Sequence, residues 1–158
     1  MDTYRLTDHE TLHVTRREPD LLECEAVYAT AGKLPPPHRH PAQKEHFEVL
    51  EGRLRTIVEG EERVLAVGET IDIPAGAAHQ MGAADGAGAR VRWQTMPPLR
   101  TEEWWAALST ARERAGGDPP LPVLARAVRA HADVFQLVFP AGLARPVLAV
   151  LARVPVGR

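Results

Sequence analysis

The chain has 158 residues, 44% of them hydrophobic and 25% charged, and its formal net charge is −2 at pH 7. This length predicts one domain with a hydrophobic core, and the near-neutral charge argues against nucleic acid as a partner. The single cysteine, Cys24, excludes a disulfide within the chain and is typical of a reducing compartment. No apolar signal segment and no run of about 18 apolar residues occurs, so we expect a cytoplasmic protein without membrane contact.

Up to residue 97 the chain consists of short stretches in which apolar and polar residues alternate. The clearest stretches are residues 21–29, 45–51, 53–58, 63–67, 70–73 and 90–96. Alternation with a period of two indicates β-strands, and many short strands separated by tight turns predict an all-β closed barrel or jelly roll. In residues 90–96 the pattern leaves open whether the row that contains Trp93 or the row that contains Arg92 faces the interior.

Two histidines and a glutamate stand out in the first half of this region. His38 and His40 are two residues apart, so on a strand their side chains project to the same side. Glu45 shares its row with Phe47 and Val49, which are apolar and belong in the interior. A buried carboxylate is costly unless it is paired or binds a metal. This row is therefore a candidate metal site.

A third histidine follows the predicted strand 70–73. Pro74 and Gly76 can reverse the chain there, so that His79 reaches back toward the first two imidazoles. Imidazole is the commonest protein ligand of metals, and carboxylate oxygen often completes such sites. We interpret the remaining histidines as surface or packing residues: His9, His13, His46 and His131.

These stretches resemble the two motifs of the cupin superfamily. Residues 32–52 fit the first motif, G-x5-H-x-H-x(3,4)-E-x6-G, at each fixed position. Residues 68–79 fit the second, G-x5-P-x-G-x2-H-x3-N, but Ala83 stands in place of its final asparagine. The resemblance to a small single-domain cupin covers roughly residues 20–97. It implies a double-stranded β-helix, which is the cupin jelly-roll barrel.

The resemblance also implies a ligand set for one divalent metal ion, which could be Fe, Mn, Ni, Co or Zn. The four ligands would be His38, His40, Glu45 and His79. Small single-barrel cupins often pair through their N-terminal strands, so we expect a homodimer. The alternative for the site is a barrel from a lineage that has lost its metal.

Beyond residue 97 the pattern changes to helical spacing. We expect a cupin barrel domain over residues 1–97 and an α-helical extension over residues 98–158 that packs on the barrel. Thr101 is a candidate cap for a first helix, a second helix is expected from Leu121, and a third from Pro146. The arginines of the extension leave open whether it only shows them to water or touches a membrane or a partner.

Three histidines and a carboxylate do not match the closed tetrahedral pattern of structural zinc sites and leave positions for a substrate. Phe47, Met81 and Trp93 predict an apolar pocket, which favours a small cyclic or aromatic organic substrate. We expect a metal-dependent enzyme, most simply a dioxygenase. The alternatives are a non-catalytic module that binds a small molecule or metal, and an oxygen-independent isomerase or polyketide cyclase. No catalytic residue outside the ligand set can be named from the sequence.

Overall fold

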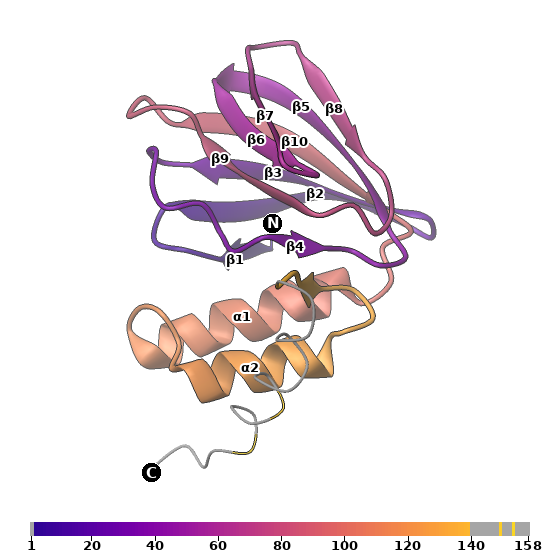
Figure 1. Cartoon of the computed structure of the whole chain (residues 1–158), viewed down its shortest axis with the longest axis vertical. Coiled ribbons are helices and arrows are strands. Elements are labelled where there is room, and N and C mark those ends of the chain that lie inside the picture. Colours follow the sequence, from indigo (N-terminus) through magenta and orange to yellow (C-terminus); the bar gives the residue numbers. More distant parts are fainter. Residues whose placement is uncertain (1, 140–148, 150–152, 154–158) are drawn as a thin grey trace.

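The computed structural model describes residues 2–139, 149 and 153 (Figure 1). Within them, strands precede two helices and a last short strand follows. The strands are β1 Thr3–Arg5, β2 Glu10–Glu18, β3 Leu21–Tyr28, β4 His38–Arg39, β5 Lys44–Gly52, β6 Leu54–Val58, β7 Glu61–Leu65, β8 Thr70–Ile73, β9 His79–Ala83, β10 Ala89–Met96 and β11 Gln136–Leu137. The helices are α1 Thr101–Ala115 and α2 Leu121–Ala130.

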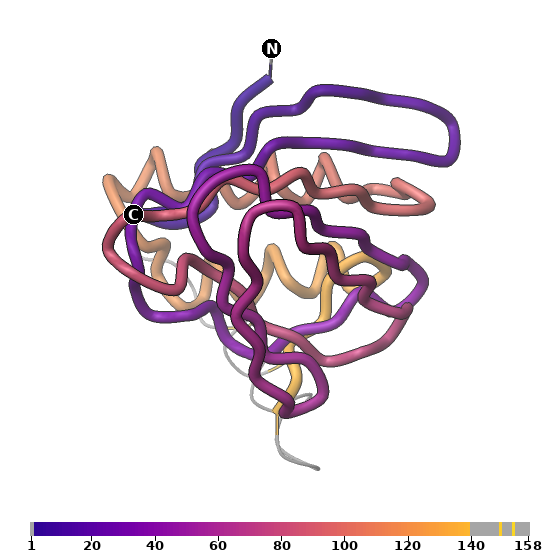
Figure 2. Tube along the Cα trace, turned by 90° about the horizontal axis from the view of Figure 1, so that it is seen from above, coloured from indigo at the N-terminus to yellow at the C-terminus, as the bar shows by residue number. Residues whose placement is uncertain are grey.

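The strands form two antiparallel sheets that enclose the core. One sheet has six strands in the order β1-β2-β3-β10-β5-β8, and the other has five in the order β11-β4-β9-β6-β7. Viewed from above, the N-terminal strands lie along one edge of the molecule (Figure 2). The predicted all-β jelly-roll barrel with helices after it is thus confirmed. None of the described helices is long and apolar enough to cross a membrane.

The structure shows which of the two side-chain rows of β10 faces the interior. Val91, Trp93 and Thr95 are buried in the barrel, while Arg90 and Arg92 face outward. Arg90 donates to Glu25 on β3 at 2.9 Å, and Arg92 pairs with Glu48 on β5. Such exposed pairs contribute little stability. Because Arg90 and Arg92 face outward, the row of β10 side chains that faces the interior contains no arginine.

The helices lie side by side below the barrel, and β1 and β4 are the labelled strands nearest to them (Figure 1). Trp104 and Trp105 of α1 are buried against the barrel core. The prediction that Thr101 caps this helix was wrong, because the N-cap is Arg100 and no side chain caps it. Thr101 instead accepts a hydrogen bond of 2.6 Å from the buried Gln43 amide, which ties the helix start to the loop before β5.

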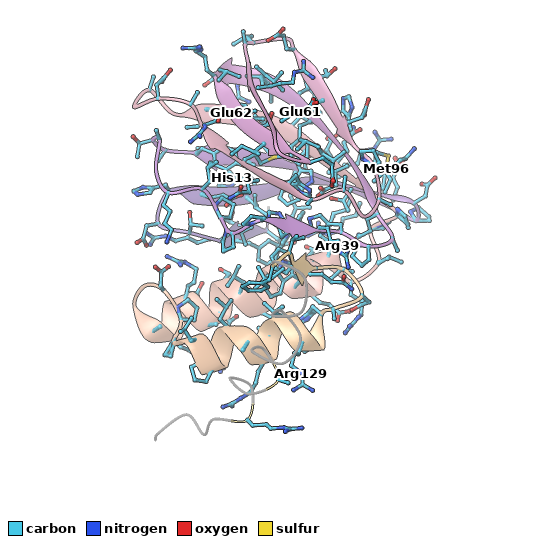
Figure 3. The ribbon with its side chains drawn as sticks, viewed as in Figure 1. His13, Arg39, Glu61, Glu62, Met96 and Arg129 are labelled. Atoms are coloured by element: carbon cyan, nitrogen blue, oxygen red, sulfur yellow. The ribbon has the colours of Figure 1, made fainter. Side chains whose placement is uncertain are left out.

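The segment after α2 returns to the barrel, which the sequence pattern did not predict. Strand β11 pairs antiparallel with β4 at the edge of the five-stranded sheet. An Arg100–Asp133 ion pair, with Nε to Oδ2 at 2.9 Å, anchors the segment before it. Arg129 lies on the side of α2 away from the barrel (Figure 3). The boundary at residue 97 stays a prediction, and the helix expected from Pro146 lies outside the described residues.

Candidate metal centre

The three motif histidines converge between the two sheets. His38 lies on β4 and pairs in register with His79, the first residue of β9. His40 follows β4 on the same side of the chain, as the two-residue spacing predicts. One nitrogen of each of the three imidazoles lies within 4.8 Å of the others. These three residues could therefore hold a metal ion.

Glu45 reaches the same cluster from β5, in the opposite sheet. Its Oε2 lies 3.1 Å from Nε2 of His79, and its Oε1 lies 3.4 Å from Nε2 of His40. The carboxylate is only 1% exposed. The four residues that the sequence singled out thus come together, although the role of Glu45 as a ligand remains a prediction.

The hydrogen bonds of the other ring nitrogens fix how the imidazoles are oriented. Each Nδ1 faces a backbone carbonyl, which can only accept, so Nδ1 carries a proton and, in the neutral ring, Nε2 carries a lone pair. The three bonds run from His38 to Pro36 at 2.9 Å, from His40 to Val134 at 2.6 Å and from His79 to Ala77 at 3.0 Å. Metal-binding histidines usually have this second bond, which holds the ring in place.

The donor and acceptor balance of the cluster fits a cation. A neutral imidazole with a protonated Nδ1 and an ionised carboxylate direct only acceptor atoms at each other. Nε2 of His40 and Oε2 of Glu45 are buried and make no hydrogen bond. Two ligand atoms bound about 2.1 Å from one metal lie roughly 3.0–3.4 Å apart, which matches the separations at Glu45. A metal between these atoms would remove the cost of burying unsatisfied acceptors.

The ionisation states also suit metal binding. Burial, helped by the neighbouring imidazoles, lowers the pKa of His38 to about 3, and burial lowers the pKa of His40. Burial acts to raise the pKa of Glu45, but His40 and His79 outweigh it and the pKa is lowered. For His79, burial acts to lower the pKa, yet the adjacent Glu45 raises it overall. His79 is therefore the imidazole whose proton competes most with a metal.

A tryptophan holds the carboxylate from the barrel interior. Trp93 on β10 donates its Nε1 hydrogen to Oε1 of Glu45 at 2.9 Å. The indole is stacked on Phe47, with ring centroids 5.4 Å apart, and contacts Trp105 at 5.0 Å. The sequence pattern placed Trp93 in one of the two side-chain rows of β10, but it did not show which of these rows faces the interior.

Phe135 covers the cluster from the C-terminal segment, and sequence reasoning missed this contact. Its ring lies 5.0 Å from that of His38 at 24°, and 6.0 Å from that of His40 at 69°. Trp104 stacks on Phe135 at 4.6 Å. Helix α2 ends at Ala130, so Phe135 lies beyond it, in the segment that leads into β11. No local signal marks a contact between residues this far apart.

The other histidines take no part in the cluster. His46 faces outward, and its Nδ1 lies 2.7 Å from Oδ1 of Asp72. His131 directs its Nδ1 to the carbonyl of Ala127, and His13 contacts the hydroxyl of Thr3. They act as surface and packing residues, as the sequence predicts.

Comparison with known proteins identifies the class that the fold and site suggest. Residues 25–96 match the family model of the cupin domain, and this match includes both of the motifs at residues 32–52 and 68–79. No curated protein matches the sequence.

Solved structures agree with that fold. KdgF from a Halomonas species is 22% identical with a TM-score of 0.56, over 61% of this chain and 86% of that one. An RmlC-like cupin from Shewanella frigidimarina is 15% identical with a TM-score of 0.57, over 64% and 87%. FeII HppE is 19% identical with a TM-score of 0.52, over 60% of this chain and 55% of HppE. Likeness at such low identity shows the fold alone, so the chemistry has to be argued from the site.

Proposed function

We propose that this protein binds one divalent metal ion through His38, His40, Glu45 and His79. The observation that carries the proposal is the buried cluster of acceptor atoms, in which neither Nε2 of His40 nor Oε2 of Glu45 has a hydrogen-bond donor. Mixed imidazole and carboxylate ligands suit Fe, Mn, Ni, Co or Zn rather than Mg or Ca. The ligand set leaves one or two positions free for a small molecule.

Elemental analysis of protein purified without added metal tests the site. We expect close to one metal ion per chain in the wild type. The His79→Ala variant should retain at least about tenfold less, because it loses a ligand. His46→Ala is the matched control, since His46 lies next to Glu45 in sequence but faces Asp72 at the surface. Equal metal content in His79→Ala and the wild type would contradict the assignment.

We further propose that the site is that of a metal-dependent enzyme with dioxygenase-like activity on a small organic substrate. A metal with open positions can act as a Lewis acid or bind dioxygen. The chain's own residues supply the surroundings: Trp93 orients Glu45, while Phe47 and Met81 make the interior beside it apolar. An apolar interior excludes water and favours a cyclic or aromatic substrate over a charged one.

Oxygen uptake by the Fe(II)-loaded protein tests this activity. We expect consumption with at least one member of a panel of catechols, flavonols and diketones, and none with Fe(II)-loaded His79→Ala protein. Turnover that persists without oxygen, or with zinc, would instead indicate an isomerase or polyketide cyclase. The absence of turnover with each metal would favour a non-catalytic binding module.

The binding module is the second candidate because the cluster is closely covered. His40, Glu45 and His79 are 4%, 1% and 3% exposed, and Phe135 lies flat on His38. A metal held in such a place could serve ligand sensing as well as catalysis. Tight ligand binding without consumption of the ligand would distinguish this role.

We also propose that the protein forms a homodimer through its N-terminal strand. Strand β1 is an edge of the six-stranded sheet, and an edge strand offers unpaired backbone groups to a second chain. Light scattering on the purified protein should give twice the chain mass of 17.3 kDa. A monomer across the accessible concentration range would contradict this proposal.

A further inference from the structure

We propose that Phe135 sets the size of the molecule that can reach the metal. This inference rests on the proposed metal site and concerns a residue outside both cupin motifs. It assigns the C-terminal segment a part in ligand selection, and it predicts that compact ligands bind freely while ligands with a second ring compete with Phe135 for space.

The four residues of the cluster are not equally exposed to solvent. His40, Glu45 and His79 are buried, whereas His38 is partly exposed. A ligand that comes from solvent therefore meets the cluster at the side of His38. Phe135 lies on that side, with its ring nearly parallel to the imidazole of His38 and 5.0 Å from it. Its ring also makes an edge-on contact with the imidazole of His40.

Phe135 is held in this place by the segment on both sides of it. Before it, the Val134 carbonyl accepts the 2.6 Å hydrogen bond from Nδ1 of His40. After it, β11 pairs with β4, so that Leu137 lies opposite His38 and Gln136 opposite Arg39. These bonds fix the backbone on both sides of Phe135, and therefore the point from which its ring extends.

Two further contacts hold the segment. Nε of Arg39 donates to the Gln136 side chain at 3.0 Å; Arg39 lies between the barrel and the helices (Figure 3). On the helix side, Trp104 stacks on Phe135 with ring centroids 4.6 Å apart. Displacing the ring would therefore disrupt contacts with both the barrel and α1, and a steric wall of this kind discriminates by ligand size.

Ligand titrations of the cobalt-loaded protein test the proposal, because Co(II) absorbance reports ligand binding without turnover. The compact probe is azide, and the bulky probe is 2,3-dihydroxynaphthalene, which has two fused rings. In Phe135→Ala, we expect the affinity for 2,3-dihydroxynaphthalene to rise by about tenfold or more, while the affinity for azide changes less than about twofold. Phe135→Leu should give an intermediate gain.

The matched control is Phe139→Ala, since Phe139 belongs to the same segment but is 38% exposed. It should leave both affinities unchanged. The proposal is overturned if both Phe135 variants bind the two probes as the wild type does, or if both affinities rise equally. Loss of cobalt from both variants would also overturn it, because Phe135 would then only support the imidazoles. A wild-type protein that binds no cobalt would instead refute the metal site itself.

Discussion

Two glutamates at opposite ends of one sheet, the buried Glu45 and the half-buried Glu10, show how far neighbouring groups decide the chemistry of a carboxylate. Glu45 on β5 lies opposite Thr95 of β10. Glu10 on β2 lies opposite Tyr28 of β3, at the other end of the same sheet. Burial raises the pKa of Glu10 to about 7, although a hydrogen bond with Tyr28 acts to lower it. At Glu45 burial acts in the same direction, but the imidazoles outweigh it and the pKa is lowered.

Burial alone therefore does not make a carboxylate a metal ligand. Glu10 can meet the cost of burial by keeping a proton near neutral pH. At Glu45 the interaction with His40 and His79 favours the ionised carboxylate, and a metal that displaces the proton of His79 would take over this role.

Removing the charge of Glu45 should weaken metal binding most. We expect Glu45→Gln to lower the metal affinity by about 100-fold, or about 2.7 kcal/mol, because an amide is a weak ligand for these metals. Glu10→Gln makes the same chemical change at the other end of the sheet and should leave the affinity unchanged. Competition titrations with a chelator measure both variants. Equal losses would show that the contrast between the two glutamates is wrong.

Acid should release the metal through His79. The pKa of His79 is raised in the metal-free protein, so below that pKa a metal has to displace its proton. We expect the affinity to fall by about tenfold per pH unit in that range, starting above the ordinary histidine pKa of about 6.5. His38, with a pKa of about 3, should add nothing near neutral pH. Chelator titrations from pH 8 to pH 5.5 test this, and a flat profile would contradict it.

Loosening Glu45 without changing its charge should have a smaller effect. Trp93→Phe removes the donor to Oε1 of Glu45 but keeps an aromatic ring. We expect the metal affinity to fall by about tenfold, as for other residues that orient a ligand. Trp105→Phe is the matched control, because Trp105 packs against Trp93 without bonding to the carboxylate. If the two variants lose affinity equally, packing rather than the hydrogen bond is responsible.

The smallest effect concerns stability at the Glu10 end. A raised folded-state pKa stabilises the fold below the unfolded value of about 4.5, and this contribution is lost as pH rises through about 7. Glu10→Gln should therefore stabilise the metal-free protein by about 1 kcal/mol at pH 8.5 and hardly change it at pH 4.5. Urea unfolding at the two pH values measures this. A stabilisation independent of pH would rule out the titration of Glu10 as its cause.

Much of the barrel and of the candidate site could be predicted because the signals are local. Strand alternation placed Glu45 in the row of Phe47, and the two-residue spacing put His38 and His40 on one side. Turn residues before His79 directed it back toward them. The end of α2 and the strand β11 could not be predicted in this way, because β11 forms only where β4 offers an edge to pair with. The metal, the substrate and the homodimer stay predictions.

Alternation and turn chemistry act over a few neighbouring residues, so they were enough to predict the jelly-roll class and the four residues that meet between the sheets. The inward orientation of Trp93 toward Glu45 depends on long-range packing and could be seen only in the folded chain. The same holds for the contact of Val134 with His40, 94 positions away, and for Phe135 covering His38. Nothing in the local pattern around Glu10 and Glu45 separates their ionisation. Burial and charge depend on residues that only folding brings together.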